Sequence, residues 1–306
     1  MRNDSSCSRR DFCRGALVAG AAAALGVRAG DAAAAPAAAP KSPWQIGCFT
    51  RPWDRYDWRT ALDAIAEAGY SYAGLMTTKS PTGLVISAAT PVEEAARIGE
   101  EAKKRGLAIP SVYGGDIPVG ESLAAGIAGM RRLIDNCAAA RAASLMMGGT
   151  GDPKLNDVYY KAIAEACPYA AEKKIGITVK PHGGLNATGP QCRALIAKVG
   201  QASFRLWYDP GNIFYYSDAK LDPVDDSTTV DGLVVGMSVK DYRHPKEVLL
   251  TPGTGKVNFK AVMANLRVGG FTSGPLIVET LLVGELPVLL EEAKKARKFV
   301  EAFASA

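Results

Sequence analysis

Four apolar segments of this 306-residue chain end in charged side chains whose types could support catalysis. These side chains are Lys180, Asp209, Lys240 and Glu279. Lys180 is the most informative of them, because a lysine at the end of a buried strand is costly unless a carboxylate or a substrate anion pairs with it. Its alternative role is that of a structural counter-ion for Asp209. Several such groups at the ends of apolar strands indicate an active site more readily than a core.

His182 adds a group that can carry protons. It lies in a glycine-rich loop directly after the strand that ends at Lys180, a context that favours contact with a ligand. Imidazole titrates near neutrality, so His182 is a candidate general acid or base. The second histidine, His244, precedes Pro245 in a polar loop, and we expect it to be solvated. Two histidines exclude a histidine-rich zinc cluster.

The composition fits one large globular domain or two small ones, with 48% hydrophobic residues, 22% charged residues and a net charge of +5. Part of the positive excess lies near the N-terminus, and no basic stripe interleaved with aromatic residues follows. We therefore expect no nucleic-acid partner. Four cysteines beyond the first forty residues, at 48, 137, 167 and 192, are widely spaced without a Cys-x-x-Cys pair. They predict small buried side chains rather than zinc ligands.

Residues 1–40 have the pattern of a twin-arginine signal peptide followed by an Ala/Pro-rich linker. Arg9 and Arg10 precede a short apolar run over 15–27, and residues 31–40 offer small-residue cleavage sites. The run is too short for a stable membrane anchor, so we expect export to the periplasm or the extracellular space. The alternative is a disordered Ala-rich tail with a chance arginine pair. The folded domain is predicted over 41–306.

Beyond residue 41 the chain alternates between strand-like and helix-like segments. The expected strands cover 44–49, 70–76, 107–113, 143–147, 175–180, 204–209, 233–239 and 275–279. The expected helices cover 58–68, 121–140, 158–174 and 288–303, with three more opened by the capping residues Thr90, Thr188 and Asn258. The helix after the sixth strand is the least regular, because 218–229 is polar and contains proline.

Eight strand–helix alternations in about 260 residues predict an α/β fold, a (β/α)₈ TIM barrel. The strands are continuously apolar, as parallel strands covered by helices require. An open doubly wound sheet is the alternative. It would usually carry a glycine fingerprint after the first strand, and residues 47–51 do not provide one.

In a closed barrel, the carboxyl ends of the strands meet at one mouth. This brings together seven side chains that lie far apart in the sequence: Lys180, His182, Asp209, Asn212, Ser238, Lys240 and Glu279. The segments that hold them are Lys180-Pro181-His182-Gly183-Gly184, Asp209-Pro210-Gly211-Asn212, Ser238-Val239-Lys240-Asp241-Tyr242-Arg243 and the Glu279 strand, with Gly253 to Phe259 between the last two. In their order and spacing the chain resembles the sugar phosphate isomerase/epimerase family, which has a xylose isomerase-like TIM barrel.

That resemblance implies a divalent cation held by Glu, Asp, His and Glu from strands five to eight. The matching positions here are Lys180, Asp209, Ser238 and Glu279, so two of the four ligands are replaced. An ammonium at a ligand position repels a cation, by roughly 4 kcal/mol per unit charge at ~4 Å and intermediate dielectric. No cofactor is therefore assigned, and Mn²⁺, Mg²⁺ or Zn²⁺ is left open with Asp209 and Glu279 as the remaining candidate ligands. Our hypothesis is that Lys180 replaces the metal.

The resemblance also implies roles for the remaining residues. The expected catalytic residues are Lys180, His182, Asp209 and Glu279, and the expected substrate-binding residues are Asn212, Ser238, Lys240 and Arg243.

Three functions follow for a small-molecule carbohydrate substrate. The first is a sugar isomerase or epimerase that moves a proton next to a carbonyl. The second is a lyase or hydratase that acts on an oxidised (keto) sugar. The third is a non-catalytic carbohydrate-binding barrel, whose aromatic surface would come from Trp53, Trp207, Tyr208, Phe214, Tyr215 and Tyr216. Which sugar is bound, whether phosphate is recognised and the oligomeric state are left open.

Overall fold

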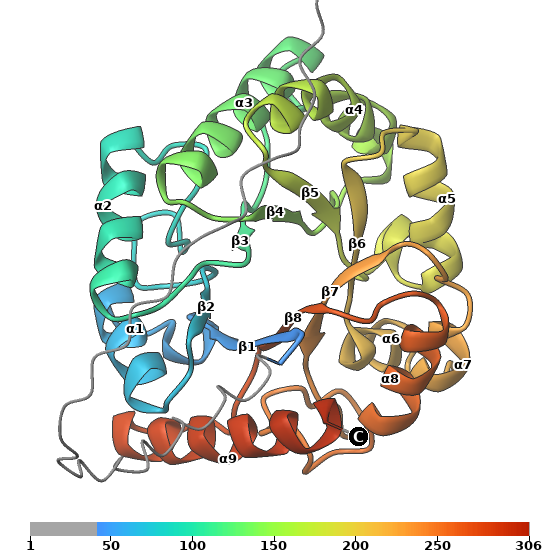
Figure 1. Ribbon diagram of the computed structural model, residues 1–306. Helices are drawn as coiled ribbons and strands as arrows, with labels where there is room; N and C mark the ends of the chain where they lie inside the picture. The colour runs from blue at the N-terminus through green and yellow to red at the C-terminus, as the bar shows by residue number, and fades with distance from the viewer. Residues whose placement is uncertain (1–41, 306) are drawn as a thin grey trace, which may run out of the picture. The chain divides into compact units, whose positions relative to one another are not determined.

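A ring of eight parallel strands forms the centre of the computed structural model, which describes residues 42–305 (Figure 1). The strands are β1 (Trp44–Phe49), β2 (Tyr72–Gly74), β3 (Val112–Tyr113), β4 (Ser144–Met147), β5 (Gly176–Val179), β6 (Phe204–Tyr208), β7 (Val234–Val239) and β8 (Gly274–Val278). Their order in the sheet is β2-β1-β8-β7-β6-β5-β4-β3. Parallel bridges between Tyr72 and Ala108 and between Leu75 and Val112 join the two ends. The predicted (β/α)₈ barrel is confirmed.

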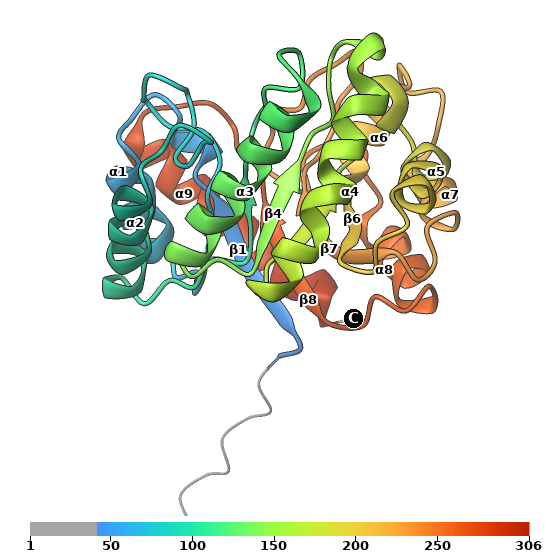
Figure 2. The same cartoon turned by 90° about the horizontal axis from the view of Figure 1, so that it is seen from above.

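Helices surround this ring on the outside, and the view from above shows them on both sides of the strands (Figure 2). They are α1 (Trp58–Glu67), α2 (Val92–Lys104), α3 (Leu123–Ala139), α4 (Asn156–Glu172), α5 (Gly189–Val199), α6 (Pro210–Tyr216), α7 (Pro223–Ser227), α8 (Phe259–Val268) and α9 (Leu286–Ala304). The irregular stretch after β6 forms the two short helices α6 and α7, each with a proline at its first position.

Two of the three predicted helix caps are confirmed. The Thr188 hydroxyl accepts from the backbone of Gln191 in a reciprocal capping box, and the Asn258 side chain accepts from the N–H of Ala261 at 3.1 Å. The prediction for Thr90 is wrong. Its hydroxyl accepts from the N–H of Ser87 at 2.9 Å instead, and α2 begins after Pro91 without a side-chain cap.

The expected strand over 107–113 is also shorter than predicted. Only Val112 and Tyr113 form regular strand, while Ala108 and Ile109 pair through isolated bridges. The interruption falls at Pro110, which has no backbone N–H to donate to a neighbouring strand.

The interior of the barrel has an apolar floor. Phe49, Met76, Met146, Trp207 and Ile277 pack together there, all at most 4% exposed. Successive side chains of a strand alternate between its faces. Asp209 and Glu279 therefore lie on the same inward face as Trp207 and Ile277, two residues earlier. The charged groups at the mouth thus rest on an apolar layer that excludes water from below.

Two further expectations concern the cysteines and the N-terminus. The four cysteines of the barrel, at 48, 137, 167 and 192, are buried and free, as predicted. The predicted signal peptide and linker over 1–40 lie outside the described residues, and the domain boundary at 41 stays a prediction. Within residues 42–305, no helix has the length and apolar character needed to cross a membrane.

Candidate active site

The carboxyl ends of β5, β6 and β8 bring one positive and two negative side chains into contact. Lys180 follows β5, Asp209 follows β6 and Glu279 follows β8. The Lys180 Nζ lies 2.9 Å from Asp209 Oδ2 and donates to Glu279 Oε2 at 2.6 Å. All three side chains are at most 2% exposed. The amine therefore lies between the two carboxylates that the sequence placed at this mouth.

Two more cations complete the group. The Lys240 Nζ, after β7, donates to Glu279 Oε1 at 2.7 Å and to Asn212 Oδ1 at 3.0 Å. The Arg51 guanidinium, from the 3₁₀ turn Arg51–Trp53 after β1, donates to Glu279 Oε1 at 2.6 Å. We call Arg51, Lys180, Asp209, Lys240 and Glu279 the charge cluster. The sequence analysis missed Arg51, although its place directly after the first strand is a signal of the same kind.

Neutral hydrogen-bond donors, one from a side chain and one from the backbone, hold the two carboxylates in position. The Ser238 hydroxyl donates to Glu279 Oε2 at 2.6 Å and accepts from Trp207 Nε1 at 3.1 Å. The backbone N–H of Asn212 donates to Asp209 Oδ1 at 2.9 Å, and its amide Nδ2 donates to the carbonyl of Pro181 at 2.6 Å. Ser238 and Asn212 are both buried. They support the charge cluster from below rather than face open solvent.

The charges in the cluster set the protonation states. Burial alone would raise the pKa of Glu279, but Lys180, Lys240 and Arg51 hold it well below its ordinary value. Burial alone would lower the pKa of Lys180, but Asp209 and Glu279 raise it above its ordinary value. At neutral pH Lys180 is therefore an ammonium and Glu279 a carboxylate.

Lys240 differs from Lys180 in this respect. Burial, with help from the positive charges of Lys180 and Arg51, lowers its pKa despite the nearby carboxylates. With three cations against two carboxylates, the fully ionised cluster carries one net positive charge. Arg51 is 30% exposed, so solvent screens part of this excess charge.

A cleft of about 270 Å³ opens above the cluster, and we call it the reaction cleft. It is lined by Arg51, Asp54, Met76, Thr77, Tyr113, Lys180, His182 and Glu279. Lys180 and Glu279 form its charged floor, whereas Lys240 and Asp209 lie beneath and do not line it. A ligand in this cleft would meet the Lys180 ammonium directly.

His182 stands at the rim of the reaction cleft, where it reaches solvent. Its ring lies between those of Tyr113 and Tyr216, with centroids 6.4 Å and 5.6 Å away. The closely packed surroundings, together with the positive charges of Lys180 and Lys240, lower the pKa of His182 to about 4. The imidazole is therefore neutral at pH 7 and able to accept a proton.

The donor set does not fit the divalent ion that the resemblance implies. Two carboxylates remain, and each is already ion-paired with at least one ammonium group. A hard divalent ion needs several anionic or imidazole ligands. Over residues 42–305 no three His, Cys, Asp or Glu side chains form a group that could hold a metal ion.

Two groups of predicted residues lie away from the site. Arg243, expected to bind substrate, is exposed and bonds to Glu247 Oε2 at 3.1 Å and to the carbonyl of Thr254 at 3.2 Å. It does not reach the charge cluster, because residues 243 and 247 pair as a surface bridge.

The proposed aromatic surface is also mostly core. Trp53, Trp207, Tyr208 and Phe214 are at most 2% exposed and cannot stack on a sugar ring.

A family model described as xylose isomerase-like TIM barrel matches residues 62–303. The chain belongs to this family. Solved structures with the same fold include a xylose isomerase domain protein from Planctomyces limnophilus, at 16% identity and TM-score 0.65, covering 85% of this chain and 97% of that one. None of the curated proteins compared with the chain matches it.

Two further structures of this fold have ligands in their descriptions. A D-allulose 3-epimerase from Methylomonas sp., in complex with D-allulose, shares 18% identity at TM-score 0.65, over 85% of this chain and 96% of that one. A xylose isomerase-like TIM barrel protein from Mycobacterium smegmatis, in complex with magnesium, shares 18% identity at TM-score 0.66, over 85% and 98%. At these identities the likeness establishes the fold.

Proposed function

We propose that the protein is a sugar isomerase- or epimerase-like enzyme that moves a proton next to a carbonyl of a carbohydrate, with Lys180 in place of the divalent ion. The observation that carries this proposal is the position of the Lys180 amine, 2.9 Å from Asp209 and 2.6 Å from Glu279 at the base of the reaction cleft. Family membership and the carbohydrate bound by the D-allulose 3-epimerase of the same fold support a sugar ligand.

Lys180 would act on the carbonyl oxygen of the substrate. An ammonium has three N–H donors, and its two contacts with Asp209 and Glu279 leave one for the cleft. When a proton leaves the neighbouring carbon, negative charge develops on that oxygen. A fixed positive charge in a dry site stabilises it more strongly than water would.

His182 would be the base that takes the proton. It lines the cleft, and its low pKa keeps it unprotonated at neutral pH. Arg51 and Lys240 act indirectly, since they keep Glu279 ionised and so hold the Lys180 amine in place. Asn212 and Ser238 position the two carboxylates.

A lyase or hydratase acting on an oxidised (keto) sugar is the second candidate. A single available N–H on Lys180 suits one carbonyl oxygen, whereas a divalent ion can hold a carbonyl and a neighbouring hydroxyl together. Loss of a proton beside that carbonyl is common to both reactions, and the lyase would then expel a group from the next carbon.

We further propose export by the twin-arginine route, supported by the Arg9-Arg10 pattern. Export favours the lyase or hydratase, because phosphorylated sugars are scarce outside the cytoplasm.

Deuterium exchange from solvent tests the proposal. Purified protein, with and without EDTA, is mixed in D₂O with a panel of ketoses, aldoses and keto-sugars, and incorporation beside the carbonyl is followed by NMR. We expect incorporation that EDTA does not change and that Lys180→Met abolishes, while the exposed-lysine variant Lys198→Met retains it. Loss of water or of a substituent would identify the lyase.

Two results would overturn the role of Lys180. One is activity that EDTA removes and Mn²⁺ restores. The other is one equivalent of tightly bound metal that Asp209→Ala removes. Exchange that fails on every sugar, while sugars still raise the unfolding temperature, would point to a binding protein instead.

A further inference from the structure

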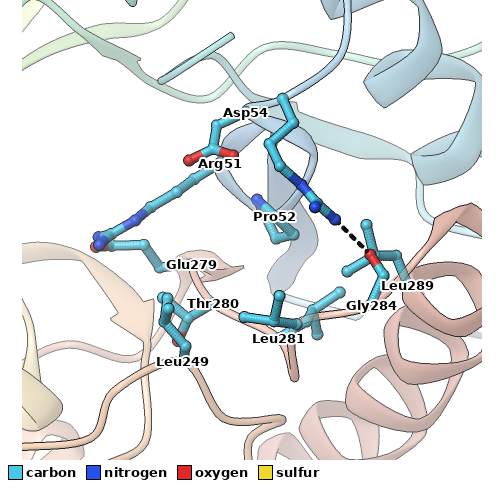
Figure 3. A pocket seen from close by; sticks show the side chains of 11 residues that line it. Arg51, Pro52, Asp54, Leu249, Glu279, Thr280, Leu281, Gly284 and Leu289 are labelled. Carbon is cyan, nitrogen blue, oxygen red and sulfur yellow. Dashed lines mark hydrogen bonds and ion pairs between the residues drawn. The ribbon is translucent and has the colours of Figure 1, made fainter.

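A second cavity of about 320 Å³ adjoins the reaction cleft, and Figure 3 shows the side chains that line it. The two share Arg51, Asp54 and Glu279 as lining residues, so the Arg51–Glu279 ion pair forms a wall common to both. In the close view, the Arg51 side chain extends to Glu279 along one side, and Pro52 and Leu281 lie across from each other. Arg51 is 30% exposed at this wall, so one molecule that reaches both spaces would lie across the Arg51 side chain.

The two spaces differ in chemistry. Away from the shared residues, the second cavity is walled mainly by Pro52, Leu249, Leu281, Val283 and Leu289, and we call it the apolar cavity. Leu249 and Val283 are 46% and 58% exposed, although nothing in the folding of the barrel requires aliphatic side chains to face solvent there. Apolar side chains gathered in a concave site next to a few polar groups are typical of ligand pockets.

The walls of the apolar cavity are fixed by hydrogen bonds. Arg55 donates to the carbonyl of Gly284 at 2.9 Å, which ties the turn after β1 to the segment between β8 and α9. The Tyr56 hydroxyl bonds to Glu285 at 3.1 Å, and the Leu282 N–H donates to the Thr251 hydroxyl at 3.2 Å. The cavity is therefore formed before a ligand arrives, which lowers the entropic cost of binding.

We propose that the apolar cavity receives an aryl or alkyl substituent carried by the carbohydrate whose carbonyl lies in the reaction cleft. An apolar cavity of about 150 Å³ in another protein is large enough for benzene, so the present one has room for a ring-sized group. The inference rests on the proposed function only in placing the sugar in the reaction cleft. It identifies the substrate class as sugars with an apolar substituent rather than free monosaccharides.

Paired ligands test this by binding alone. Isothermal titration calorimetry on the full protein compares the phenyl with the methyl glycosides of 3-keto-β-D-glucose, 3-keto-β-D-galactose and 3-keto-β-D-xylose, which carry both a ring carbonyl and the substituent. For at least one sugar we expect the phenyl member to bind about tenfold more tightly or better, a difference of the size that apolar groups give in a fitted pocket. Leu249→Ser and Val283→Ser should remove most of that gain without unfolding the barrel, because both side chains are largely exposed.

The matched control is Val268→Ser, which changes an aliphatic residue that is 89% exposed on α8 and does not line the cavity. It should keep the full gain. Phenyl members that bind no more tightly than methyl members overturn the proposal, and so does a gain that survives both serine variants. A change from dimer to monomer in those variants, with the phenyl gain intact, would assign the surface to a second copy of the chain.

The result is distinguishable from a failure of the proposed function. If the phenyl ligands bind more tightly but no deuterium is exchanged, the apolar cavity is supported and the proposed proton transfer is refuted. If deuterium is exchanged on free sugars but the phenyl ligands bind no more tightly, the proton transfer is supported and the role of the apolar cavity is refuted.

Discussion

Replacement of Lys180 by methionine is the sharpest perturbation of this site. Methionine has a side chain of similar reach but no charge, so the barrel interior keeps most of its packing. Asp209 then loses its 2.9 Å ion pair and keeps the Lys240 amine, 3.6 Å away, and the hydrogen bond from the backbone N–H of Asn212. Glu279 loses the donor at 2.6 Å and keeps Lys240, Arg51 and Ser238.

The loss of stability arises mainly at Asp209, which is fully buried. Removing one partner of a buried ion pair typically destabilises a protein by about 3–5 kcal/mol, because the remaining charge is left unpaired. The variant cluster has two cations and two carboxylates, so Lys240 and Arg51 limit the loss and the lower part of this range applies. At about 3 kcal/mol, and roughly 2–4 °C per kcal/mol for a domain of this size, the unfolding temperature should fall by roughly 6–12 °C.

The pH dependence of the unfolding temperature provides an independent test of this loss of stability. The pKa of Glu279 lies well below its ordinary value in the folded protein, so its contribution is present above the pKa of the unfolded chain and is lost as pH falls through the folded pKa. The pKa of Lys180 is raised, so its contribution is present below the unfolded pKa and is lost as pH rises beyond that value. The difference between wild type and variant should be full at pH 7 and shrink at acid pH below 4.

Thermal unfolding of both proteins between pH 3 and pH 10, by circular dichroism, measures this difference. Lys198→Met is the control, because Lys198 pairs with Asp157 on the surface, where solvent screening makes an ion pair contribute little to stability. A Lys180→Met protein as stable as wild type at pH 7 would refute the reasoning, because the buried carboxylates would then not depend on the amine.

Three further predictions concern the same site. His182→Gln should reduce exchange by about 10²–10⁴-fold with little change in stability, and the wild-type rate should fall as pH drops through about 4, where the imidazole gains a proton. Ser238→Ala should cost about 1–3 kcal/mol in chemical unfolding, because the buried Trp207 Nε1 and Glu279 each lose a partner. Lys180→Glu combined with Ser238→His should acquire Mn²⁺ binding in calorimetry where wild type shows none, and a double variant that binds no metal would count against the ligand correspondence.

The main part of the site could be predicted because its signal is local. Lys180, Asp209, Lys240 and Glu279 each follow a continuous apolar run, and a closed parallel barrel places all such positions at one mouth. Once the eight strands are recognised, no further information is needed to bring these residues together. The structure adds which of these charged groups contact one another. These contacts depend on side-chain packing rather than on strand order.

Arg51 and Trp207 show what the sequence does not reveal. Arg51 follows β1 closely, which is a signal, but it lies in a short turn among other charged residues. Its partner Glu279 is 228 positions away, so the sequence does not distinguish Arg51 from its charged neighbours. Trp207 has the residue type of a sugar-stacking surface. The alternation of β6 turns it inward, where it forms the barrel floor and donates to Ser238. Arg243 lies away from the charge cluster because its motif continues past the end of β7 into a surface loop.

The net charge of the four ligand positions explains why an amine can stand where the resemblance implies a metal. Three carboxylates and a histidine around a divalent ion carry a total charge of −1. Here Lys180, Asp209, Ser238 and Glu279, at the same four positions, also carry −1 when they are ionised. The Lys180 ammonium therefore takes the place of a carboxylate and the divalent ion together without changing the total charge. A developing oxyanion in the reaction cleft would be stabilised by this fixed ammonium, which interacts more strongly with the oxyanion than with the neutral carbonyl of the substrate.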